Sequence, residues 1–301
     1  MCQYASVNTA LRGRYIIYSW IPLEIRSMKS SNWSVLGAGS ILVLHGSVAL
    51  AHDPVFGIGP HVLFKGGVDS TVELAQSKAG DDKDRGLALQ AVYGITGNWS
   101  AGIDVPYVAK DSATDSSSGL SDLRAFTKYR FWREDSLGLQ ESAAVMLAVN
   151  GNNGNETDSP PLGNGATDLM AGLTYGYESI ERYRWVSVRY LRPGRNGTGL
   201  RMGNKWLLDF VLGWRPVTPE YRKPDTVWLL ELNGEITARA DMNGNRIASS
   251  GGTEWFISPG IFWTYRNFAI KSGIQLPVAS DLNGTQAASD YRFKASFEWH
   301  M

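Results

Sequence analysis

Residues 291–301 read Y-R-F-K-A-S-F-E-W-H-M, and the spacing of their apolar side chains indicates the fold class. One face of it carries the side chains of Tyr291, Phe293, Ala295, Phe297, Trp299 and Met301. The opposite face carries those of Arg292, Lys294, Ser296, Glu298 and His300. Such an alternation is typical of a β-strand with one apolar and one polar face, and no helix would separate the two classes in this way.

The same alternation recurs along the chain from residue 69 onward. In residues 203–214, for example, Trp206, Phe210 and Trp214 share a face opposite Lys205 and Asp209. Counting such segments predicts twelve strands, at 69–79, 86–96, 98–109, 121–132, 138–149, 166–178, 181–191, 203–214, 225–240, 253–265, 267–279 and 288–300.

The connections between these segments fall into two classes. Those after the second, fourth, sixth and tenth strands are short, whereas several others are long and rich in Gly, Asn, Asp and Ser, such as 151–165. Short turns at one rim and long polar loops at the other are typical of membrane-spanning barrels. We therefore predict an all-β fold, a transmembrane antiparallel β-barrel of the outer-membrane type with about 12 strands. The alternative, a soluble sandwich or inward-apolar barrel, is disfavoured by the strand lengths and by the Trp and Tyr near strand ends.

The N-terminal region predicts export. A basic start at Met28 is followed by an apolar run and by A-L-A at 49–51, the pattern of a cleaved secretory signal. We expect translation to start at Met28, cleavage after Ala51, and location in the bacterial outer membrane. The predicted parts are a leader at 1–51, a periplasmic or lumenal segment at 52–68, and the barrel at 69–301. The only cysteine, Cys2, lies in the leader, so the expected mature chain has no disulfide.

Sixteen charged residues occupy the polar faces of the predicted strands and are expected to line the lumen. The acidic ones are Glu73, Asp104, Asp122, Asp168, Asp209, Glu231, Glu235 and Glu298. The basic ones are Arg124, Lys128, Arg130, Lys205, Arg239, Lys271, Arg292 and Lys294. Enclosed charges usually pair with one another, and an equal balance argues against a strongly ion-selective pore. A small water-filled pore and a largely closed interior both remain open.

The segment before the first strand, H-D-P-V-F-G-I-G-P-H-V-L-F-K-G-G at 52–67, holds the most concentrated polar chemistry. We hypothesise that it partly occludes the lumen, with Phe56 and Phe64 packing and with His61 and Lys65 pairing with lumenal carboxylates. Cleavage after Ala51 would also give His52 a free amine beside its imidazole, which with His61 forms a candidate Cu(II) or Zn(II) site. The plainer interpretation is a segment whose glycines let it bend against the barrel wall.

Several function classes are disfavoured. The 29 basic and 29 acidic residues cancel, which argues against a nucleic-acid partner. No H-E-x-x-H or Walker motif is present, and no cofactor is expected. The outer-membrane phospholipase architecture needs a His with a Ser two residues on, which none of His52, His61 and His300 has. We therefore do not expect an enzyme.

Five stretches together resemble a known family. They are 52–67, G-L-S-D-L-R-A-F-T-K-Y-R-F, G-N-G-A-T-D-L-M-A-G-L-T-Y-G-Y, W-L-L-E-L-N-G-E, and the long run from S-G-G-T-E-W-F at 250–256 to I-Q-L-P-V at 274–278. They are similar to the outer-membrane transporter-like family labelled for the meta-pathway of phenol degradation. The resemblance implies an outer-membrane barrel that helps apolar or aromatic compounds to cross. One departure is the end of the chain, where His300 and Met301 follow Trp299 although barrels of this kind often end on an aromatic residue.

The expected function is thus a passive channel for small, apolar or aromatic molecules. Its expected partners are outer-membrane lipid, the barrel-assembly machinery and an unidentified small molecule. Two alternatives stay open: an envelope metal-handling protein that binds copper or zinc through its N-terminal histidine, and a structural barrel with a closed lumen.

Overall fold

The computed structural model describes residues 53–218 and 223–301. Twelve long strands dominate these residues: β1 Val68–Ala79, β2 Asp82–Thr96, β3 Trp99–Asp111, β5 Arg124–Ser136, β6 Leu139–Asn150, β7 Asp168–Ser179, β8 Arg182–Arg192, β10 Lys205–Trp214, β11 Asp225–Thr237, β14 Gly252–Tyr265, β15 Phe268–Leu282 and β16 Tyr291–His300. Four short strands accompany them: β4 Ser116–Leu120, β9 Leu200–Arg201, β12 Asp241–Met242 and β13 Asn245–Arg246. The described residues contain no helix long and apolar enough to cross a membrane.

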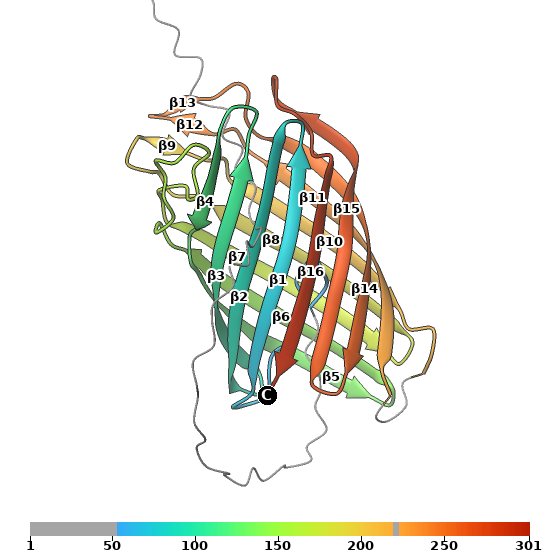
Figure 1. Cartoon of the computed structure of the whole chain (residues 1–301). Coiled ribbons are helices and arrows are strands. Elements are labelled where there is room, and N and C mark those ends of the chain that lie inside the picture. The colour runs from blue at the N-terminus through green and yellow to red at the C-terminus, as the bar shows by residue number, and fades with distance from the viewer. Residues whose placement is uncertain (1–52, 219–222) are drawn as a thin grey trace, which may run out of the picture.

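The long strands form one closed antiparallel ring. Each pairs with its neighbours in chain order, and β1 pairs with β16 over the register from Asp69 opposite His300 to Lys78 opposite Tyr291. The predicted fold class, an antiparallel barrel of twelve strands, is confirmed. Figure 1 shows the strands tilted strongly around the axis, as closure of a barrel requires.

The two rims differ as the connections predicted. Tight turns such as 137–138 and 180–181 lie at the rim that holds the C-terminus, whereas most of the long loops gather at the opposite rim (Figure 1). Two connections depart from this rule: the long one between β10 and β11 lies at the C-terminal rim, and the tight turn at 80–81 lies at the other rim. Four short strands at that rim were not predicted from the sequence. Three of them have only two residues each and form a small separate sheet in the order β13-β12-β9, too short for a periodic pattern to be visible.

Strand boundaries differ from the prediction at two places that matter for the site. The strand predicted at 121–132 corresponds to β5, which begins only at Arg124, after a break that follows β4. β5 runs on to Ser136 past a register shift between Arg130 and Trp132. The strand predicted at 225–240 ends at Thr237, where the chain leaves the wall for the long-loop rim.

The outer face of the wall is apolar and exposed, whereas the side chains of the inner face are mostly buried inside the barrel. Outward-pointing residues of the strands include Leu147, Leu173, Phe210 and Leu230, each strongly exposed, while their neighbours in sequence point inward and are mostly buried. An apolar exterior on a ring without open edges is suited to a lipid bilayer, where backbone groups find no water to bond.

A charge on the outer face should therefore destabilise the barrel. Phe210 lies midway along β10 and is 46% exposed, so Phe210→Arg should lower the free energy of unfolding by about 2–4 kcal/mol, the cost of an arginine near the bilayer midplane. Urea titration of protein folded into lipid vesicles measures this. The matched control is Val217→Arg in the connection after β10, 71% exposed, which should change little. Equal effects for both would contradict a lipid-facing Phe210.

Candidate functional site: a chain segment anchored in the barrel lumen

Residues 53–63, here called the lumenal segment, lie inside the barrel and contact its inner wall from many sides. Most of them are buried, including Val55, Ile58, His61 and Leu63. The segment has no strand pairing of its own, so its backbone groups depend on side chains of the wall. Its contacts with the wall define the candidate site.

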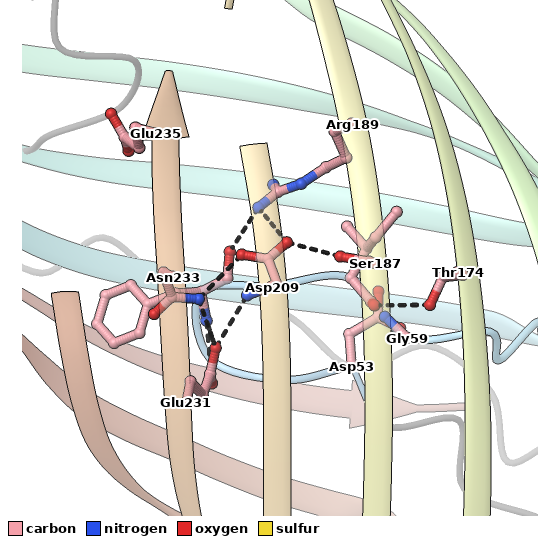
Figure 2. A network of polar contacts seen from close by, with 12 residues as sticks. Asp53, Gly59, Thr174, Ser187, Arg189, Asp209, Glu231, Asn233 and Glu235 are labelled. Carbon is pink, nitrogen blue, oxygen red and sulfur yellow. Dashed lines mark hydrogen bonds and ion pairs between the residues drawn. The ribbon is translucent and has the colours of Figure 1, made fainter. Parts of the chain in front are cut away.

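Glu231 on β11 is the main acceptor for the segment's backbone. The N–H of Val55 donates to Oε1 at 2.7 Å, and the N–H groups of Phe56 and Gly57 donate to Oε2 at 3.2 and 3.1 Å. Figure 2 shows this carboxylate beside the loop of the segment, next to Asn233. A carboxylate that accepts several backbone N–H bonds satisfies donors that would otherwise be buried without partners.

Asp53 joins two distant parts of the wall. Its carboxylate accepts two hydrogen bonds from Nζ of Lys128 on β5, at 2.7 and 2.9 Å, and its carbonyl oxygen accepts one from Nζ of Lys271 on β15 at 3.2 Å. On the shorter way round the ring β16, β1, β2 and β3 separate these strands, so residue 53 spans the lumen. Burial alone would raise the pKa of Asp53, but the two ammonium groups more than offset this and lower it.

Polar side chains of the wall around Glu231 form a hydrogen-bond network of their own. Asp209 on β10 accepts hydrogen bonds from Ser187, Arg189 and Asn233 at 2.6–2.9 Å (Figure 2). Arg189 also donates to the carbonyl oxygen of Phe56 at 3.2 Å. The backbone of the segment is thereby bonded on both its donor and its acceptor sides, as a buried chain requires.

Apolar side chains of the segment fill two clusters in the lumen. Val55 belongs to a cluster in the half of the barrel nearer the short turns, and Phe56 packs against this cluster. Its wall members are Trp185, Val211, Val227, Leu229, Phe262 and Ala269. Ile58 belongs to a second cluster on β5–β10: Phe126, Met146, Ala148, Met170, Leu191 and Leu207. The interior is therefore packed around the segment with apolar as well as polar contacts.

His61 holds the lumenal segment near the short-turn rim, by an ion pair with Glu178 that is here called the lower anchor. Its Nε2 lies 2.7 Å from the Glu178 carboxylate, and its ring meets Trp185 edge to face. Burial would lower the pKa of this imidazole, but the Glu178 carboxylate more than offsets it, so the pKa is raised above its ordinary value. The protonated form of His61 is thus the one that holds the segment to β7.

Most of the predicted lumenal charges are paired. Lys205 and Arg292 both reach Glu235, Lys294 lies 3.4 Å from Glu73, Lys271 lies 2.5 Å from Glu298, and Arg124 lies 3.8 Å from Asp104. Arg130 donates to the carbonyl of Gly97 in the turn below, and Asp168 accepts from Asn164 and from the backbone of Gly194. Such pairs keep the cost of enclosing charge low.

Two predicted lumenal residues lie elsewhere. Arg239 is exposed at the long-loop rim and donates to Asn283, because β11 ends before it. Asp122 lies in the break between β4 and β5, where its carboxylate accepts the backbone N–H groups of Gly154 and Asn164. This carboxylate fixes the loop that follows β6.

Of the four residues predicted to occlude the lumen, Phe56 and His61 lie inside it, and Phe64 and Lys65 lie at the short-turn rim. Phe64 is 51% exposed, and Lys65 is exposed without an ion pair to any described residue. The chain turns there against Gly94, where any side chain would collide with the carbonyl of Phe64. Backbone bonds between Gly94 and residues 66 and 67 fix this exit.

The predicted metal site lies partly outside the described residues, because His52 is not among them, so this site stays a prediction. Its second proposed ligand, His61, is bonded to Glu178. A different group, Asp69, Glu298 and His300, places one ligand atom each within 4.8 Å of the others. Because Lys271 already neutralises Glu298 there, we assign it no metal.

Sequence reasoning missed Ser187, Arg189, Asn233 and Glu178. On β8 the polar Ser187 and Arg189 share the inner face with Tyr183, Trp185 and Leu191, so neither face of that strand is clearly apolar. Asn233 carries no charge, and Glu178 stands at the end of its strand. Only Asn233 could have been found from the sequence, because it stands two residues after Glu231 and so shares the inner face of the same strand.

Comparisons with known proteins agree with this geometry. A family model described as "Putative MetA-pathway of phenol degradation" matches residues 51–223, more than half of the chain. The chain belongs to this family. The resemblance drawn from the motifs is thereby confirmed. No curated protein sequence matches the chain significantly.

Solved structures place this phenol-degradation family member among outer-membrane barrels by fold. An outer membrane channel from Pseudomonas putida F1 superposes with a TM-score of 0.65 at 12% identity, covering 80% of this chain and 98% of that one. The NanC porin gives a TM-score of 0.46 at 9% identity over 76% of this chain and 98% of its own. The translocator domain of the autotransporter NalP from Neisseria meningitidis gives 0.41 at 10% identity, over 79% and 89%.

Removing the Glu231 carboxylate should release the lumenal segment. Glu231→Ala leaves the N–H groups of Val55, Phe56 and Gly57 unsatisfied, so the segment should open more often, by about tenfold or more. The rate at which a water-soluble maleimide labels a cysteine at Ile58→Cys reports this opening. Glu141→Ala, which removes a carboxylate bonded to Tyr175 away from the segment, is the control. Equal labelling in both backgrounds would show that Glu231 is not the anchor.

Alkaline pH should loosen the lower anchor. Because the folded pKa of His61 is raised, its ion pair with Glu178 is fully present below its ordinary pKa of about 6.5 and is lost as pH rises through the raised value. Ion conductance in planar bilayers should therefore increase with pH over that range. His61→Gln, which cannot titrate, should flatten the profile; an unchanged profile in this variant would assign the effect to another group.

Proposed function

We propose that this outer-membrane barrel is a passive channel for small apolar or aromatic compounds. The observation that carries the proposal is the apolar cluster on β5–β10 around Ile58. Leu191 and Leu207 stand near the long-loop ends of β8 and β10, and Met170 near that of β7. These side chains are buried around Ile58, so an apolar solute that displaces the lumenal segment would gain contact with them, which favours its transfer from water.

The charged residues of the lumen support the same substrate class. Glu235 is held by Lys205 and Arg292, and Asp209 by Arg189. Cations and anions that already neutralise each other attract a charged solute weakly, so the lumen offers little to select ions.

The lumenal segment is the constriction of the proposed channel. Asp53 spans the lumen between Lys128 and Lys271, and Ile58 closes the lower end of the apolar cluster. We propose that solutes pass when this segment shifts. The leader at 1–51 with cleavage after Ala51, and the interactions with outer-membrane lipid and the barrel-assembly machinery, stay predictions of the same proposal.

Deletion of residues 53–67 should raise single-channel conductance several-fold in planar bilayers. The deletion removes the chain that bridges the lumen, while every wall strand after Val68 stays intact. A heat-shift gel first establishes that the barrel has folded. Unchanged conductance of the folded deletion variant would show that the lumenal segment is not the constriction of the channel.

Substrate class is tested in the same preparation by a pair of lumenal variants. Met170→Asp adds a carboxylate to the apolar cluster, and Ser296→Asp adds one at an inward-facing position of β16. Uptake of an uncharged aromatic compound into vesicles should fall about tenfold in the first, as expected from losing about 1.5–3 kcal/mol of apolar contact, and little in the second. Equal uptake by both would contradict an apolar path.

A further inference from the structure

Two arginines face outward at the short-turn rim. Arg182 and Arg184 are two residues apart on β8, so both point to the outer face, and both are exposed. Among residues 53–218 and 223–301 no carboxylate lies within salt-bridge distance of either guanidinium group. This contrasts with the lumen, where Arg189 of the same strand is paired with Asp209.

Aromatic residues flank the pair. The guanidinium of Arg184 lies 5.4 Å from the ring centre of Tyr177 on β7. On the other side, Trp214 of β10 is opposite Arg182 in the register and is 58% exposed. Outward Trp and Tyr side chains near strand ends mark the membrane–water interface, so the arginines lie at headgroup depth.

A hollow opens beside them. It has a volume of about 520 Å³, and its lining includes both arginines, Tyr177 and Leu137 of the turn after β5. Ile180 and Glu181 of the turn after β7 also line it. Leu137 is fully exposed and Ile180 is half exposed. The two guanidinium groups outnumber the single Glu181 carboxylate, and positive charge beside apolar side chains matches an amphiphile that has a negative headgroup and hydrocarbon chains.

We propose that this hollow binds the phosphate of an anionic phospholipid from the periplasmic leaflet. The short turns of outer-membrane barrels face the periplasm, so a hollow at this rim lies in the leaflet built of phospholipids. Arg182 and Arg184 bind the phosphate, Tyr177 fixes the guanidinium of Arg184, and Leu137 and Ile180 contact the start of the acyl chains. The proposal depends on the barrel lying in the outer membrane and not on what passes through its lumen.

Native mass spectrometry of the full-length protein in detergent tests the site, with phosphatidylglycerol and phosphatidylethanolamine added in equal amounts. The wild type should retain phosphatidylglycerol preferentially. Arg182→Gln with Arg184→Gln should weaken that retention about 30-fold, as expected for two interfacial arginines. Arg184→Gln alone gives an intermediate loss and serves if the double variant does not fold on a heat-shift gel. The control is Arg133→Gln at the same rim, whose side chain is bonded to Asp135.

Three results would overturn the proposal. They are equal retention of the two lipids by the wild type, unchanged phosphatidylglycerol binding in the folded Arg184→Gln variant, and an equal loss in Arg133→Gln. An arm with inorganic phosphate separates the two sources of the ligand chemistry. Displacement of the lipid by millimolar phosphate alone would assign the arginines to free phosphate and not to a membrane lipid.

Discussion

Hydrocarbon offers no hydrogen-bond partner, so every backbone group in the wall has to bond to a neighbouring strand. The ring meets this constraint by pairing β1 with β16, which leaves no open edge around the barrel. Because the backbone groups of each strand bond to the neighbouring strands, successive side chains must point alternately to lipid and to lumen. The apolar exterior and the enclosed charges are two consequences of the same closure.

The enclosed charges in turn shape the N-terminal segment. A lumen lined by Lys128, Glu231 and Lys271 contains groups that need partners, and the segment supplies backbone N–H groups, a carbonyl and a carboxylate in matching positions. Its apolar residues fill the space between them. The segment is therefore part of the interior packing, and any passage through the barrel is coupled to the stability of these few contacts.

The fold was predictable because it rests on period and connection length, both of which are local properties of the sequence. The residues that hold the segment were less visible. Glu231 and Lys128 followed from alternation, but their binding of Val55 and Asp53 depends on contacts over 176 and 75 residues that no local pattern encodes. On β8 the alternation fails because Trp185 faces the lumen while Arg182 and Arg184 face outward. Arg239 was misplaced because polarity continues past the end of β11 into the loop.

The bridge made by Asp53 also constrains the order of assembly. Its contact with Lys271 spans 218 residues, so the first described residue of the chain meets a strand that is among the last to be synthesised. Contacts of such separation form late, after shorter-range hairpins have closed. Since β1 and β16 seal the ring, the segment must be inside by the time of sealing or must enter through the rim afterwards. The barrel that forms first without it would be a kinetic intermediate with an unfilled interior.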